Sequence, residues 1–193
     1  MRHRKARLSC LGLTLVVFLA SGCATTARFT AADTAAVDRL IGLIGERLDV
    51  APDIARMKWN TKTPIEDLPR ERQILDEVAR RATGYGLDPS LARTFFGGQI
   101  AASKAAQYAL HAEWTASTQA PFAKMVDLDK DIRPVLDRLT PAMLRALAEA
   151  LPVIQQPGGR QLVETQSKAI LAKAPGGTAA VREAVTPLLQ MSK

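Results

Sequence analysis

Apolar residues recur every three or four positions along most of this chain, the spacing of one face of an α-helix. The first such stripe follows Asp33, which can cap a helix, and consists of Val37, Leu40, Ile41, Leu43, Ile44 and Leu48. Pro52 interrupts or kinks this helix, and the apolar pattern resumes after it through Ile54, Met57 and Trp59. No window shows the alternation of a half-buried strand, so the sequence predicts an all-α fold.

Proline and glycine residues divide the rest of the chain into further helices. Pro64 suits the first turn of a second helix, and Asp88 with Pro89 should cap and open a third. A loop follows the third helix between Pro121 and Asp127. The expected ranges are about 64–83, 88–117, 128–151, 160–173 and 178–190. The chain is therefore predicted to be a single-domain bundle of about six helices.

Residues 1–22 have the organisation of an export signal. Four basic residues form its head, and residues 11–20 form an apolar run too short to span a bilayer core of about 30 Å as a helix. Small residues then precede Cys23, an order typical of a bacterial lipoprotein signal, in which this cysteine is acylated and becomes the new N-terminus. Plain cleavage nearby is the alternative, because small residues lie on both sides of Cys23. Both readings predict an exported, periplasmic protein, and acylation would tether it to a membrane.

Removal of this signal changes what the composition implies. The chain has 26 Lys and Arg residues against 19 Asp and Glu, but four of the basic residues lie in the signal, which leaves 22 against 19, or +3. We therefore expect no nucleic-acid partner. Cys10 and Cys23 belong to the signal and its cleavage site, and His111 is the only histidine beyond it. A histidine or cysteine metal site, a cysteine nucleophile and a disulfide are accordingly not expected.

The segment from Lys58 to Glu71 carries polar residues at helical spacing. Asp67 and Arg70 are three residues apart, and Asp67 and Glu71 are four apart, so these three should share one side of the second helix. Arg47 precedes Lys58 by eleven residues, about three helical turns. Both side chains would return to one face if the proline between them leaves the helix direction largely intact.

On the third helix, Gln99, Ser103 and Gln107 recur every four residues and form a polar stripe beside apolar neighbours. Buried polar groups need partners, and a polar ligand would provide them. Each residue alone has a plainer reading, since such polar side chains commonly face water or form surface ion pairs. Phe95 and Phe96 are expected in the core rather than at a ligand. The three polar clusters occur together on successive helices, and this combination favours a shared ligand site over the plainer reading of each residue.

At these residues the chain resembles the all-helical chorismate mutases. The similarity is carried by the runs VAPDIARMKWNTKTPIEDLPRERQIL (50–75) and GLDPSLARTFFGGQIAASKAAQYAL (86–110). The Lys-Trp pair, the FFxxQI stretch and the signal resemble the exported subclass. The combination of Lys-x8-Asp-x2-Arg-Glu with a later Ser-x3-Gln is specific, although no single element is. The resemblance covers about residues 36–138 of a domain expected over 31–193.

The resemblance implies an isomerase that rearranges chorismate to prephenate by an intramolecular Claisen-type step, without metal, cofactor, covalent intermediate or proton transfer. It implies substrate contacts from Arg47, Arg70 and Arg133 to carboxylates, from Lys58 and Gln107 to the ether oxygen, from Asp67 and Glu71 to the ring hydroxyl, and from Ser103 to a carboxylate. Lys58, Gln107 and Arg70 would be the catalytic residues. Gln107 is a departure, because some exported relatives carry glutamate there.

Other hypotheses stay open beside the mutase. The main rival is a non-catalytic helical envelope lipoprotein that binds a small anion or a protein partner, which the signal and the helical content fit equally well. A degenerate mutase domain retained for binding is weaker, since the set of polar residues is intact. Residues 139–193 offer only amphipathic helices, which could stabilise the domain, form a homodimer or regulate activity.

Overall fold

The structure of the protein is a computed structural model that describes residues 29–192. Within that range the chain forms helices and no strand, so the predicted all-α fold is confirmed. The predicted signal and Cys23 lie outside the described residues. None of the helices in the described part is both long enough and apolar enough to cross a membrane.

The helices follow one another in the order that the sequence predicts. They are α1 (Ala31–Asp49), α2 (Ala51–Thr61), α3 (Leu68–Ala82), α4 (Pro89–Ala116), α5 (Arg133–Ile154), α6 (Gly159–Ile170) and α7 (Gly177–Met191). A 3₁₀ turn, Thr83–Tyr85, follows α3, and a π-helix, Leu128–Ile132, precedes α5. The predicted first helix is divided near its proline into α1 and α2, so six predicted helices correspond to the seven α-helices of residues 29–192.

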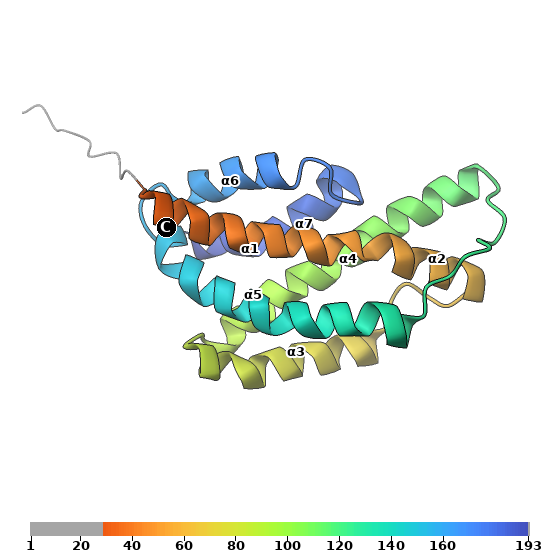
Figure 1. Ribbon diagram of the computed structural model, residues 1–193, viewed down its shortest axis with the longest axis horizontal. Helices are drawn as coiled ribbons and strands as arrows, with labels where there is room; N and C mark the ends of the chain where they lie inside the picture. Colours follow the sequence, from red (N-terminus) through yellow and green to blue (C-terminus); the bar gives the residue numbers. More distant parts are fainter. Residues whose placement is uncertain (1–28, 193) are drawn as a thin grey trace, which may run out of the picture.

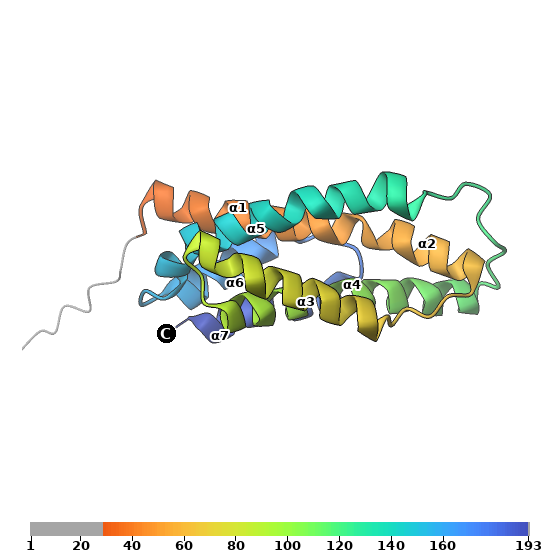
Figure 2. The ribbon, with the colours of Figure 1, turned by 90° about the horizontal axis from the view of Figure 1, so that it is seen from below.

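These helices form an elongated bundle of two layers. α2 continues α1 in almost the same direction, and α5 lies alongside α1 (Figure 1). α3 and α4 form a hairpin on the other side of the bundle, and α7 packs along α4 (Figure 2). α6 connects the layers through its contacts with α1 and α7. The α1–α2 junction, the start of α3, the middle of α4 and the start of α5 consequently face one another.

Local capping decides where the helices begin. Thr30, rather than the predicted Asp33, is the N-cap of α1. The two residues form a capping box, because the Asp33 N–H donates to the Thr30 hydroxyl at 3.1 Å and the Thr30 N–H donates to the Asp33 carboxylate at 2.9 Å. Asp88 caps α4 as predicted, accepting from the N–H groups of Ser90 and Leu91. The predicted start of α4 at Pro89 is confirmed.

The start of α3 differs from the prediction by four residues. Pro64 lies in the loop before α3, and Pro69 occupies the first turn in its place. Asp67 is the reason, because its carboxylate accepts a hydrogen bond from the Arg70 N–H at 3.1 Å and so caps the helix. Two prolines five residues apart compete for the first turn, and the one preceded by a capping side chain prevails. Asp67 therefore lies at the helix entrance rather than within the helix.

The core lies between the two layers. Among its fully buried side chains are Leu40 and Ile44 of α1, and Phe95 and Phe96 of α4, as predicted for the two phenylalanines. The C-terminal helices complete it, because Leu188 of α7 is also fully buried. A Cβ on Gly98 of α4 would lie 2.5 Å from a Pro187 side-chain carbon, so these two helices approach as closely as glycine allows. The described residues from 139 onward, up to 192, therefore have a packing role.

Candidate functional site

A cavity of about 230 Å³ lies where these helices face one another. Its polar lining includes the eight residues that the sequence proposed for substrate contact: Arg47, Lys58, Asp67, Arg70, Glu71, Ser103, Gln107 and Arg133. Isoleucine and leucine side chains from these helices, from the loop before α3 and from the π-helix supply most of the remaining wall. Sites for drug-sized ligands commonly measure about 300–1,000 Å³, so this cavity suits a smaller, compact molecule.

Arg47, in the last turn of α1, provides a buried positive charge. Its side chain is 8% exposed, and its Nε atom has no hydrogen-bond partner within residues 29–192. Burial lowers the pKa of Arg47 to about 10. A desolvated guanidinium without a paired carboxylate is costly, and an anion in the cavity would compensate for that cost.

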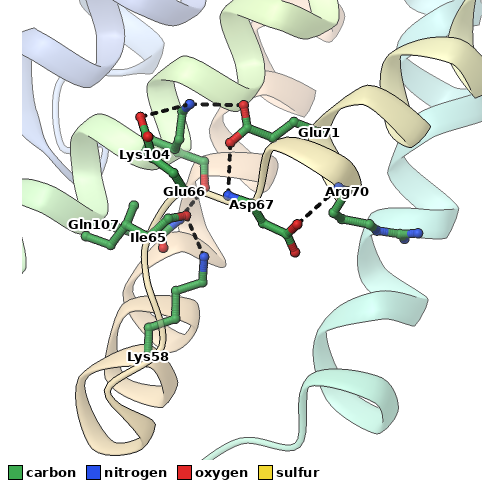
Figure 3. Close-up of polar contacts among 9 residues, drawn as sticks. Lys58, Ile65, Glu66, Asp67, Arg70, Glu71, Lys104 and Gln107 are labelled. Atoms are coloured by element: carbon green, nitrogen blue, oxygen red, sulfur yellow. Dashed lines mark hydrogen bonds and ion pairs between the residues drawn. The ribbon is translucent and has the colours of Figure 1, made fainter.

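Lys58 reaches the cavity from α2. Its Nζ atom donates a hydrogen bond of 2.6 Å to the carbonyl oxygen of Ile65, in the loop before α3 (Figure 3). Burial lowers the pKa of Lys58, the carboxylates of Asp67 and Glu71 oppose that change, and the nearby cation of Lys104 adds to it. An ammonium group has three N–H donors, so Lys58 has donors left for a ligand after bonding to the loop.

The first turn of α3 holds Asp67, Arg70 and Glu71 together. The Glu71 carboxylate accepts from the Asp67 N–H at 3.4 Å, while Asp67 caps the helix through the Arg70 N–H. The Arg70 side chain extends towards α5 (Figure 3), and its guanidinium makes one long contact of 3.4 Å, to Gln73. The three residues that the sequence grouped are therefore brought to one helix end, with the Arg70 cation near the start of α5.

Ser103 and Gln107 face the cavity from α4. Gln107 is 4% exposed, and its amide nitrogen donates to the Ser103 hydroxyl at 3.1 Å. The amide oxygen is buried without a partner in the described part of the chain. An amide nitrogen carries two N–H groups, so one remains for a ligand.

Gln99 does not belong to this polar group, and the predicted stripe was wrong there. Its amide donates to the carbonyl oxygen of Ala184 at 2.9 Å, in the interface between α4 and α7. The reason is the helix period of 3.6 residues. A step of eight residues turns the side chain through two full turns and about 80° more, so residues 99 and 107 do not share one direction. Gln99 and Gln107 consequently point to different neighbours.

Arg133 and Lys104 complete the charged lining. Arg133 is the first residue of α5, has a side chain 51% exposed and forms an ion pair with Asp129 of the π-helix. Lys104 does not belong to the pattern of four-residue steps that includes Ser103 and Gln107, so that pattern does not indicate it. Its spacing of three from Gln107 was the available signal, since residues three apart share a helix face.

The charges of the lining favour an anionic ligand. Five cations, Arg47, Lys58, Arg70, Lys104 and Arg133, face two carboxylates, Asp67 and Glu71, which leaves an excess of +3. Within residues 29–192, no three His, Cys, Asp or Glu side chains gather closely enough to hold a metal ion. The cavity combines arginine guanidinium groups and lysine ammonium groups with an amide donor. This set can bind two carboxylates and stabilise a developing negative charge.

Comparisons with known proteins agree with this geometry. A family model described as chorismate mutase type II matches residues 32–108. The secreted chorismate mutase of Mycolicibacterium smegmatis is 28% identical over 132 residues, which cover 68% of this chain and 72% of the relative. Three further relatives, all chorismate mutases, are matched over 55% to 61% of their own lengths.

Solved structures extend the likeness along most of the chain. The crystal structure of the chorismate mutase from Burkholderia thailandensis is 38% identical with a TM-score of 0.74, and covers 80% of this chain and 99% of that one. The chorismate mutase from Burkholderia phymatum is 29% identical with a TM-score of 0.76, and covers 81% and 98%. The similarity therefore includes the helices that follow the family match.

Proposed function

The chain belongs to the chorismate mutase family, and from that membership we propose that it is an isomerase that rearranges chorismate to prephenate. The observation that carries the proposal for its own residues is the convergence of unpaired buried polar atoms on one small cavity. In the described part of the chain, the Arg47 Nε donor and the Gln107 amide-oxygen acceptor have no partners. A carboxylate of a compact dianion would accept from Arg47, and a ligand hydroxyl would donate to the Gln107 oxygen.

The reaction breaks the ether C–O bond of chorismate while a C–C bond forms between the enolpyruvyl group and the ring. The flexible enolpyruvyl arm must first be held over the ring, which is a problem of orientation. The ether oxygen gains negative charge as its bond breaks, and preorganised donors stabilise that charge. A millionfold acceleration needs about 8 kcal/mol from these two effects together.

Three arginines would bind the two carboxylates. Arg47 is already desolvated beside the cavity, and Arg70 has a guanidinium with only one long contact. Arg133 would exchange its ion pair with Asp129 for a substrate carboxylate. The planar guanidinium fork matches a carboxylate in two parallel hydrogen bonds, so these contacts restrict rotation as well as attract charge.

Lys58 and Gln107 would donate to the ether oxygen. They reach the cavity from α2 and α4, respectively. Lys58 would also meet a carboxylate. The hydroxyl of the ring would bind to Glu71 and to the backbone near Asp67, and Ser103 would support a carboxylate. Every one of these groups acts without gaining or losing a proton.

Turnover of chorismate separates this proposal from a non-catalytic anion-binding lipoprotein. Purified residues 24–193 are mixed with chorismate, and loss of its ultraviolet absorbance is followed. We expect conversion to prephenate, with Arg70→Ala and Lys58→Ala each lowering turnover by at least about a hundredfold, because each removes a charge-assisted contact. Lys168→Ala, at an exposed lysine of α6, is the matched control and should leave turnover unchanged.

One result would reject the proposed activity, and another would reject only the roles assigned to individual residues. Absence of prephenate at micromolar protein would reject the activity, and calorimetry would then show whether the cavity binds the dianion without converting it. A mutase should also bind a rigid transition-state mimic far more tightly than chorismate. Near-normal rates in Arg70→Ala or Lys58→Ala would count against the assigned roles alone.

The relatives named as secreted enzymes support export of this chain. We propose in addition that Cys23 is acylated and tethers the domain to a membrane, with α1 beginning eight residues later. Expression of the full chain with a labelled fatty acid should give a labelled protein in the membrane fraction. Cys23→Ser should abolish the label, and label in that variant would refute the assignment. The molar mass of residues 24–193 in light scattering tests whether the chain forms a homodimer.

A further inference from the structure

Lys104 forms an ion pair across the cavity wall that the proposed reaction does not use. Its Nζ atom lies 3.0 Å from one Glu71 oxygen and 3.7 Å from a Glu66 oxygen (Figure 3). The side chains of Lys104 and Glu71 are only 21% and 19% exposed, whereas that of Glu66 is 57% exposed. The half-buried pair with Glu71 is therefore the stronger of the two. It connects the middle of α4 to the first turn of α3.

This contact fixes the direction of the Glu71 carboxylate. One of its oxygens accepts from Lys104, and the other accepts from the Asp67 N–H at 3.4 Å. Both oxygens thus have donors, one from α4 and one from the entrance of α3. A carboxylate held at both oxygens keeps one orientation, whereas one held only by a long backbone contact can rotate.

Lys58 is the other cation that attracts the Glu71 carboxylate. Burial lowers the pKa of Lys58, the carboxylates of Asp67 and Glu71 oppose that change, and the Lys104 cation adds to it. Without Lys104, no cation at this position of α4 would compete with Lys58 for the Glu71 carboxylate. A Glu71 carboxylate that turned to Lys58 would occupy N–H donors that the ether oxygen needs.

We propose that Lys104 is a positioning residue, which holds Glu71 against the first turn of α3 and away from Lys58, so that the Lys58 donors stay directed to the substrate. The inference rests on the proposed mutase activity for its kinetic consequence. Whether the Glu71 carboxylate pairs with Lys104 or turns to Lys58 can be measured without any turnover. The residue acts through Glu71 and does not itself contact the reacting atoms.

A double-mutant cycle tests this role. Lys104→Met keeps the length of the side chain and removes its charge, and we expect it to lower kcat about tenfold, with KM changed less than about threefold. Lys104→Arg should restore most of the loss, since it keeps a cation within reach of Glu71. In a Glu71→Gln background, Lys104→Met should change kcat less than about twofold, because the carboxylate to be positioned is gone. Lys168→Met is the matched control on an exposed surface.

Two kinetic outcomes would overturn the inference. If Lys104→Met lowers kcat equally with Glu71 and with Gln at position 71, Lys104 acts on the substrate directly and not through Glu71. If it raises KM alone, and salt abolishes the difference, Lys104 only attracts the dianion. A melting temperature within about 3 °C of the parent excludes a folding defect as the cause of lost turnover.

A readout that needs no turnover separates this inference from the activity. The pKa of Lys58 is followed by NMR of its isotopically labelled side chain in the parent and the variants. Loss of the Lys104 cation alone raises that pKa, so Lys104→Met is compared in the parent and in the Glu71→Gln background. The rise should be larger in the parent, because only there can a released carboxylate turn towards Lys58; Lys104→Arg and Lys168→Met should leave the pKa unchanged. Equal rises in the two backgrounds refute the inference, even where the parent converts chorismate, and a larger rise in the parent supports it even where the parent does not.

Discussion

Replacement of Arg47 by methionine should make the protein more stable and nearly inactive. Arg47 is 8% exposed, and its Nε has no partner within residues 29–192. Methionine retains most of the aliphatic stem and removes the charged group. In the absence of substrate, therefore, the substitution removes a desolvated charge and leaves the apolar packing of α1 largely intact.

The magnitude follows from the pKa of Arg47. Burial lowers this pKa well below the ordinary value of an arginine, to about 10, and each pKa unit corresponds to about 1.4 kcal/mol. The buried charge thus costs about 3 kcal/mol of unfolding free energy. The folded protein bears this cost at every pH below about 10, because there both the folded and the unfolded chain hold the proton, and the cost declines as pH rises above that value.

Thermal unfolding at pH 7 measures the effect. We expect Arg47→Met to gain about 1–3 kcal/mol, since water and relaxation reduce the full cost, and to melt about 3–10 °C higher. Its kcat/KM should fall at least about a hundredfold. Arg39→Met is the control on the same helix, where an exposed ion pair with Glu149 at 2.5 Å is lost and stability should fall by about 0–1 kcal/mol. A destabilised Arg47→Met would refute the reasoning, because the guanidinium would then have to be well paired.

Three further predictions concern pH and the start of α5. Because burial lowers the pKa of both Lys58 and Arg47, kcat/KM should stay level through neutral pH and decline as pH approaches about 10; a decline that begins below pH 8 would contradict this. Gln107→Glu should make the rate highest at acidic pH, since a carboxyl group donates only when protonated, and a flat pH–rate profile would exclude donation from this position. Asp129→Asn removes the ion-pair partner of Arg133 and should lower KM about two- to fivefold at unchanged kcat, whereas a raised KM would mean that Asp129 presents Arg133 to the substrate.

Local signals in the sequence predicted the helices well. Asp88 with Pro89 gave the start of α4 because the capping carboxylate and the first-turn proline are neighbours in the chain. The same logic placed the start of α3 too early, since Pro64 was weighed without the better cap at Asp67. Helix boundaries depend on which of several nearby caps is satisfied, and that choice is made by the folded backbone.

The residues that line the cavity were predictable as a set, but the contacts between them were not. Arg47 could be proposed from its spacing, but its lack of a partner depends on burial that only the packed helices create. The ion pair of Lys104 with Glu71 joins residues 33 positions apart, so no local pattern indicates it. Gln99 shows the opposite case, in which a regular spacing suggested a shared face that the helix period does not give.

The cavity draws its whole described lining from α1 to α5 of a single chain. The eight proposed substrate contacts all come from one copy, so the proposed chemistry does not call for a donor from a second copy. Dilution from micromolar to nanomolar concentration should therefore leave the rate per chain constant, even where it dissociates a dimer. Substitutions that change self-association would then leave the rate per chain unchanged.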